Sequence, residues 1–120
     1  MNAPTPLPEH ARTASFDVDS QYTFTSECPQ ELPVAAGIGI VPELNAQARL
    51  ARYRLGSKDA HSPQAQWVAD ATHPPFSPIA GANMDVRWPV HAVPGTRGFE
   101  LLQGLPTVTE YDFFVWKGIE

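Results

Sequence analysis

Three side chains of this sequence are of types that bind divalent metals, and their spacing places two of them together. Asp59 and His61 are separated by a single residue, and His91 lies in a later segment. If the chain around Asp59 is extended, its side chain and that of His61 point the same way. Carboxylate oxygens and imidazole nitrogens are ligands of cations such as Zn²⁺. The pattern predicts a metal site formed by Asp59, His61 and His91.

The third of these residues lies in a loop whose shape is restricted by its composition. His91 is flanked by Pro89 and Pro94 in the stretch from Trp88 to Gly98, which also contains Gly95. Proline fixes φ, and glycine allows φ values that other residues avoid. Shaped loops on a rigid scaffold often carry binding groups. Without its two partners, His91 would be interpreted as an ordinary solvent-facing or hydrogen-bonded loop histidine.

The first predicted strand runs from Ala14 to Asp19 and contains two acidic residues. Alternation assigns its side chains to two faces, with Phe16 and Val18 on one face and Asp17 and Asp19 on the other. Carboxylates at the end of a strand are usual where a parallel sheet forms its site. The alternative is that the two acids cap the turn that follows.

Two further strands are predicted, and both end in charged residues. The stretch from Tyr53 to Ser57 leads into Lys58 and Asp59, and the apolar run from Tyr111 to Trp116 leads into Lys117. The continuous hydrophobicity of the last run is typical of a strand that is buried on both faces of a parallel sheet. Because the carboxyl ends of parallel strands share one edge, Asp19, Asp59 and Lys117 should converge there.

The connections between these strands include one long predicted helix. Apolar residues at three- and four-residue spacing predict a helix over Ile38 to Arg52, with Pro42 in its first turn. A strand, a helix and a second strand in succession predict a βαβ unit. A short helix is predicted over Arg97 to Leu105. The stretch from Ser62 to Pro89 is predicted to be an ordered, packed excursion because it contains Trp67, Phe76 and Trp88.

Length and composition restrict the class of protein. A chain of 120 residues with a net charge of −5 corresponds to one domain without a basic patch, which argues against nucleic acid or an anionic membrane as a partner. No apolar run is long enough to span a bilayer. The single cysteine, Cys28, fits a reducing, cytoplasmic compartment and is interpreted as structural. Residues 1–13 are predicted to be a disordered lead-in to a domain over residues 14–120.

Four stretches of the chain resemble, in order, motifs of the nicotinamidase/isochorismatase-like cysteine hydrolases. The run from Phe16 to Phe24 resembles the family's Asp-x-Gln-x-x-Phe opening, and Lys58 to His61 resembles its metal-binding Asp-x-His. The loop from Trp88 to Thr96 resembles its Trp-Pro-x-His-Cys-Val-x-Gly-Thr loop. Val115 to Gly118 resembles the end of its catalytic-lysine strand.

The resemblance implies a three-layer, doubly wound parallel α/β domain of about six strands. It implies hydrolysis of an amide, with nicotinamide as the expected substrate, by a Cys-Asp-Lys triad, and so a role in NAD salvage. A divalent metal, Zn²⁺ first with Fe²⁺ or Mn²⁺ as alternatives, would bind the pyridine nitrogen beside the triad. The implied site residues are Asp19 and Lys117 for catalysis, Asp59, His61 and His91 for the metal, and Phe24 and Trp88 for the ring. Core packing is the alternative role for the two aromatic residues.

The match lacks the nucleophile. In this family the catalytic cysteine follows the lysine strand, whereas this sequence stops at Glu120, and Cys28 lies in the wrong place to replace it. The cysteine that usually follows the loop histidine is Ala92 here, which is a mild change. The expectation is therefore the N-terminal part of a sheet that is truncated after its third strand and is inactive alone. An open strand edge favours a homo-oligomer or pairing with a missing C-terminal part.

Three other functions fit the same residues. The first is a non-catalytic metal- or ligand-binding module that uses Asp59, His61 and His91 without a nucleophile. The second is a hydrolase in which a metal-activated water attacks the substrate directly. The third is a protein that only interacts with other proteins, which predicts no pocket joining the three strand ends.

Overall fold

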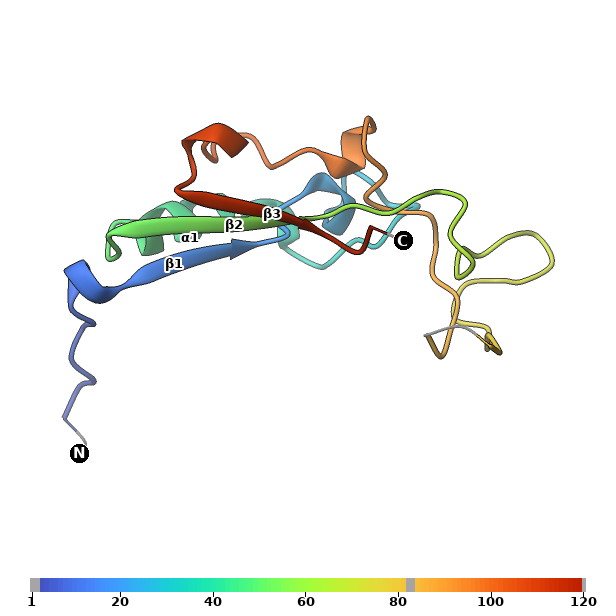
Figure 1. The fold of residues 1–120 in the computed structure, drawn as a ribbon, viewed down its shortest axis with the longest axis horizontal. Helices are drawn as coiled ribbons and strands as arrows, with labels where there is room; N and C mark the ends of the chain where they lie inside the picture. The colour runs from blue at the N-terminus through green and yellow to red at the C-terminus, as the bar shows by residue number, and fades with distance from the viewer. Residues whose placement is uncertain (1–2, 82–83, 120) are drawn as a thin grey trace.

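The computed structural model describes residues 3–81 and 84–119, which form one open parallel sheet with a single α-helix. The sheet contains strands β1 (Ala14–Val18), β2 (Tyr53–Asp59) and β3 (Phe113–Lys117), in the order β1-β2-β3. Helix α1 (Val41–Ala48) connects β1 to β2. The long connection from β2 to β3 extends beyond the carboxyl ends of the strands (Figure 1). The predicted strand-helix-strand order and the parallel pairing are confirmed.

Several short 3₁₀ turns complete the described chain, and residues 3–9 form neither helix nor strand. The turns are His10–Arg12, Tyr22–Phe24, Gly37–Gly39, Arg97–Phe99 and Val108–Glu110. The disorder expected for the lead-in stays a prediction, and the first two residues of that segment and Glu120 lie outside the described residues. No helix within residues 3–81 and 84–119 has the length and apolar character needed to cross a membrane.

Both predicted helices are shorter than their sequence patterns suggested. Helix α1 covers only Val41–Ala48 of the predicted range, with Pro42 in its first turn as expected, and it has no buried residue. Because most helical stability in proteins comes from packing of an apolar face, an unburied pattern gives no support for a longer helix. The helix predicted over residues 97–105 is a single 3₁₀ turn, because Leu101 pairs with Gln21 in an antiparallel bridge that requires extended backbone.

In strand β1 the buried face carries an acidic residue, and the exposed face carries apolar ones. In β1 the alternation is confirmed, but Asp17 is 1% exposed whereas Phe16 and Val18 are 43% and 60% exposed. Strand β3 was predicted to be buried on both faces and is instead an edge strand with Phe113 and Trp116 largely exposed. By register, one exposed face of the sheet carries Phe16, Val18, Tyr53, Leu55, Phe113 and Val115. This group is called the outer sheet face.

The opposite face of the sheet is covered by the segment that precedes β3. The Tyr111 hydroxyl donates to Asp17 at 2.8 Å, and the Phe99 ring lies under the Lys58 ammonium at 4.1 Å. Gly56 is required here because a Cβ at this position would lie only 2.6 Å from the Phe114 ring. Tyr22, Cys28 and Leu102 form a small buried apolar cluster, with Val41 and Leu105 packed against it.

Candidate metal and ligand site

At the carboxyl ends of the three strands, two carboxylates contact one lysine amine. Asp59 and Lys117 are register partners at the ends of β2 and β3, and Asp19 directly follows β1. The Lys117 Nζ lies 2.6 Å from Asp19 Oδ2 and 2.5 Å from Asp59 Oδ1. The predicted convergence of Asp19, Asp59 and Lys117 at one sheet edge is therefore present in the structure.

The backbone at Asp19 turns sharply so that its carboxylate faces Lys117. Asp19 has a φ of 51°, in the left-handed region that aspartate tolerates better than most residues. Its amide donates to the Ser57 carbonyl at 3.0 Å, and the Ser57 hydroxyl donates to Asp19 Oδ1 at 2.7 Å. These bonds fix one carboxylate oxygen and leave the other for the lysine. Asp19 is thus not a turn cap, and neither is Asp17, which instead pairs with Arg54.

The three predicted metal ligands lie together at the same end of the sheet. One ligand atom from each of Asp59, His61 and His91 lies within 4.8 Å of the others. The Nδ1 of His61 lies 2.9 Å from the Gly118 carbonyl, and the Nδ1 of His91 lies 2.7 Å from the Pro89 carbonyl. Because a carbonyl only accepts, each Nδ1 carries a proton. The Nε2 of His61 lies 3.4 Å from Asp59 Oδ2, so it has a lone pair for a metal only when the His61 ring is neutral. This arrangement of donors fits a divalent metal.

Charge and burial shift the pKa values of these groups in different directions. Burial raises the pKa of Asp59, but hydrogen bonds from His61 and Lys117 outweigh it and lower the value to about 2. The hydrogen bond to Asp59 raises the pKa of His61, whereas burial lowers the pKa of His91. Burial disfavours the Lys117 ammonium, but its bonds to Asp19 and Asp59 prevail and raise its pKa. At neutral pH the Asp59 carboxylate and the Lys117 amine are therefore charged.

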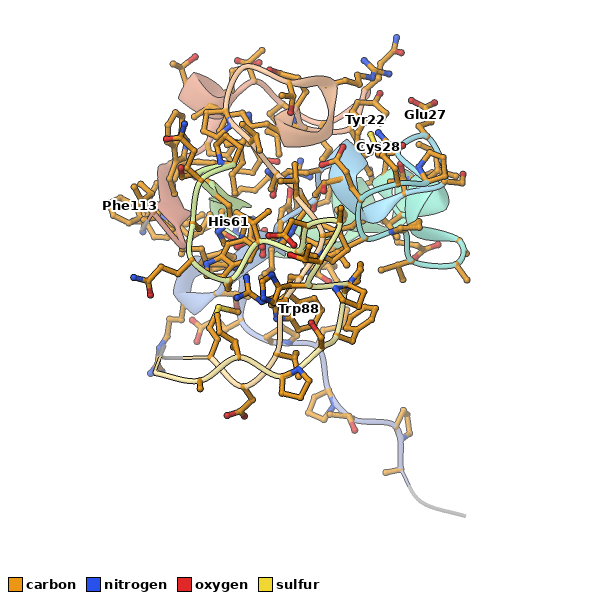
Figure 2. The ribbon with its side chains drawn as sticks, turned by 90° about the vertical axis from the view of Figure 1, so that its right-hand side faces the viewer. Tyr22, Glu27, Cys28, His61, Trp88 and Phe113 are labelled. Atoms are coloured by element: carbon orange, nitrogen blue, oxygen red, sulfur yellow. The ribbon has the colours of Figure 1, made fainter. Side chains whose placement is uncertain are left out.

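A cavity of about 610 Å³ opens beside these groups. Its described lining residues are Asp19, Phe24, Leu32, Asp59, His61, Trp67, Met84, Trp88, His91 and Gly118. Two of these lining residues, His61 and Trp88, are labelled in Figure 2. Apolar walls with a few convergent polar groups are the usual form of a small-molecule site. Both residues predicted to hold a flat ring, Phe24 and Trp88, line this cavity.

The long excursion between β2 and β3 supplies part of the wall, as expected for an ordered segment. Trp67 is buried, and its ring lies 4.8 Å from that of His61 and 5.5 Å from that of His91. Trp88 packs edge to face against Phe76 at 5.4 Å. The indole of Trp67 therefore fixes both imidazole rings, a role that the sequence pattern did not reveal.

Gln21 is a second residue whose role was missed. Its side chain is almost completely buried, and its amide nitrogen donates to the carbonyls of Asp59 and Phe99 at 2.9 and 3.1 Å. Its amide oxygen accepts from the Asp59 backbone nitrogen at 2.9 Å. Gln21 therefore fixes the backbone of a metal-ligand candidate from both sides. The only signal was its place in the run from Phe16 to Phe24.

Two other residues with reactive or ligating side chains lie elsewhere. Cys28 is 3% exposed, and burial raises the pKa of its thiol. It lies beside Tyr22 and Glu27, apart from His61 and Trp88 (Figure 2). His73 is exposed and pairs with Asp70 at 3.1 Å. Neither residue lines the cavity, which agrees with the interpretation of Cys28 as structural.

Zinc binding is expected to weaken as the pH falls from 8 to 5, the range in which imidazoles titrate. A metal competes with protons for its ligands. The pKa of His61 is raised and that of His91 is lowered, so His61 is the imidazole that becomes protonated first. Zinc titrations at several pH values, with the His61 ring followed by NMR, test this order. A decline that follows the protonation of His91 would contradict it.

The sheet and its charged carboxyl edge define an open parallel α/β protein whose site lies at the strand ends. No protein-family model and no curated protein matches the chain. Solved structures do match it. The nicotinamidase/pyrazinamidase of Acinetobacter baumanii superposes with a TM-score of 0.77 at 26% identity, over 96% of this chain and 55% of that one.

Two other solved structures give the same result. The pyrazinamidase of Pyrococcus horikoshii in complex with zinc has a TM-score of 0.58 at 27% identity, over 94% of this chain and 54% of that one. The yeast nicotinamidase Pnc1p bound to the inhibitor nicotinaldehyde has a TM-score of 0.69 at 23% identity, over 88% and 56%. This chain spans about half the length of these proteins. The expected resemblance to an N-terminal portion of the nicotinamidase/isochorismatase-like hydrolases is confirmed, as is the open α/β fold.

Proposed function

We propose that this chain forms the metal- and substrate-binding part of a nicotinamidase-like amidohydrolase, which converts nicotinamide and water into nicotinate and ammonia. The observation that carries the proposal is one cavity lined by the ligand candidates Asp59, His61 and His91 and by Asp19, whose carboxylate contacts Lys117. The zinc complex of the P. horikoshii pyrazinamidase supports the choice of Zn²⁺, with Fe²⁺ or Mn²⁺ as alternatives.

The chain's own residues would bind and orient the ring of the substrate. A divalent cation held by Asp59, His61 and His91 would supply a Lewis acid able to accept a pyridine nitrogen. Phe24 and Trp88, which both line the cavity, would hold the flat ring between them. The buried indole of Trp67 excludes water from one side of the imidazoles. These contacts favour a planar aromatic amide with a ring nitrogen.

The Asp19 carboxylate would accept the proton of the nucleophile. Its Oδ2 contacts Lys117, whose positive charge would favour an adjacent thiolate. No cysteine, serine or threonine lines the cavity among the described residues, and Cys28 lies apart from it. Because Cys28 is the one cysteine of these 120 residues, the nucleophilic thiol would have to come from another polypeptide segment, and these residues alone are expected to release no ammonia from nicotinamide.

Substrate binding can be tested without turnover. Calorimetric titration of the zinc-loaded chain with nicotinamide and with benzamide compares two amides of the same shape, of which only nicotinamide has a ring nitrogen. We expect nicotinamide to bind about tenfold more tightly, equivalent to about 1.4 kcal/mol, and the difference to vanish without zinc. Equal affinities with zinc present would refute the proposed mode of binding.

A non-catalytic metal- or ligand-binding module remains the second candidate function. The specific observation in its favour is that the described cavity lining includes the Asp19 carboxylate, which contacts Lys117, but no hydroxyl or thiol. This function predicts the same preference for nicotinamide and no hydrolysis in any longer form of the protein. Measurement of ammonia release from a longer polypeptide that includes these residues separates the two functions.

A further inference from the structure

The backbone of Ala92, the residue that follows the metal-ligand candidate His91, is held on two sides by hydrogen bonds. Its amide donates to Glu31 Oε1 at 3.0 Å and to the Thr23 hydroxyl at 3.2 Å. The Thr23 hydroxyl in turn donates to the same Glu31 oxygen at 2.8 Å. On the other side, the His61 amide donates to the Ala92 carbonyl at 3.1 Å. This one residue therefore links the segments that carry both imidazoles.

The conformation of Ala92 explains why such support is needed. Its φ is 50°, in the left-handed region that residues with a Cβ seldom adopt, and its side chain is fully buried. Strained backbone of this kind persists only where the surroundings determine it. The direction of the chain at residue 92 also sets the direction in which the preceding His91 ring projects.

The position of the Glu31 carboxylate depends on a glycine in the same loop. A Cβ added to Gly98 would lie 2.3 and 2.4 Å from the two Glu31 carboxylate oxygens, so the carboxylate rests directly against the Gly98 backbone. Only glycine leaves this space. The seat formed by Thr23, Glu31 and Gly98 is called the Ala92 seat.

We infer that Glu31 is a positioning residue that aims His91 at Asp59 and His61 by holding the Ala92 amide in the Ala92 seat. Glu31 would not touch the metal, and it would act through the backbone of the loop. The role in metal binding rests on the proposed function. The neighbouring Glu27 offers a contrast, because its carboxylate pairs with Arg97 on the surface, where both side chains are exposed.

Cobalt titrations of matched variants test the inference, since Co²⁺ reports its ligands through its visible absorption. Loss of a partner that orients a ligand costs about 10–100-fold in metal affinity, and we expect this loss for Glu31→Ala. The Glu31→Gln variant keeps an oxygen that can accept the Ala92 bond, so its affinity should stay within about threefold of the wild type. Glu27→Gln is the control and should match the wild type.

The absorption spectrum distinguishes positioning from a general loss of folding. The cobalt spectrum of Glu31→Ala should approach that of His91→Ala, and the double variant should bind no more weakly than His91→Ala alone. Additive losses, or an unchanged spectrum in Glu31→Ala, would overturn the inference.

A measurement without metal separates this inference from the proposed function. The hydrogen exchange of the Ala92 amide and the NMR signals of the His91 ring report the seat directly. We expect faster exchange and shifted ring signals in Glu31→Ala but not in Glu27→Gln. If the wild type binds no cobalt, the proposed metal function fails. Unchanged exchange and ring signals in Glu31→Ala would overturn the role of Glu31, whatever the cobalt result.

Discussion

Zinc affinity is expected to fall at least about a hundredfold when His91 is replaced by alanine, because a metal ligand should matter at least as much as the groups that orient it. Asp59→Asn should cause a loss of the same order, since it removes the one charged ligand of the three. A ring nitrogen of His91 lies within 4.8 Å of the ligand atoms of the other two residues, and its Nδ1 is held by the Pro89 carbonyl. Calorimetric zinc titration of the three proteins measures the effect.

The chain offers a matched control for this experiment. His73 and Asp70 also form a histidine–aspartate pair, with a separation of 3.1 Å, but both are exposed and do not line the cavity. His73→Ala should therefore bind zinc as the wild type does. If His91→Ala and His73→Ala bind zinc equally well, the assignment of the metal site is wrong.

Replacement of Asp17 by alanine is expected to destabilise the fold by about 3–5 kcal/mol, the usual cost of removing one partner of a buried ion pair. Asp17 is 1% exposed and accepts from Arg54 Nε at 2.9 Å and from the Tyr111 hydroxyl at 2.8 Å. Without it, a largely buried guanidinium and a buried hydroxyl lose their acceptor. Because Asp17 joins all three strands or their flanks, the loss should affect the whole sheet.

Urea unfolding followed by circular dichroism measures this change. The Glu27→Ala variant is the control, because the Glu27–Arg97 pair lies at 2.9 Å but is exposed, and such pairs contribute about 0–1 kcal/mol. A destabilisation by Asp17→Ala no larger than that of the control would show that the buried network contributes little.

The parts of the site that could be predicted from the sequence are those that depend on local geometry. Strand alternation brings Asp59 and His61 to one side of an extended chain, and parallel pairing brings Asp19 and Lys117 to one edge. The prediction of His91 as the third ligand came from the composition of its loop and from the family resemblance. These predictions need only strand direction and parallel order, which the apolar pattern indicates.

The parts that could not be predicted depend on contacts between distant segments. Gln21 and Glu31 are fixed by hydrogen bonds to Asp59 and Ala92, and no spacing in the sequence marks these pairs. The pattern of β1 gave the two faces correctly but not which of them is buried, because burial depends on the segments that pack there. The same cause explains the exposed edge strand β3.

The outer sheet face affects the thermodynamics of the folded chain. Its four most exposed members, Phe16, Val18, Tyr53 and Phe113, are already between 43% and 62% in contact with water in the folded state. Unfolding of these 120 residues therefore exposes less additional apolar surface to water than is usual for a chain of this length. The heat-capacity increment and the denaturant m-value, which both scale with newly exposed surface, are reduced accordingly. Polar contacts such as those of Asp17 then contribute a larger share of the free energy of unfolding.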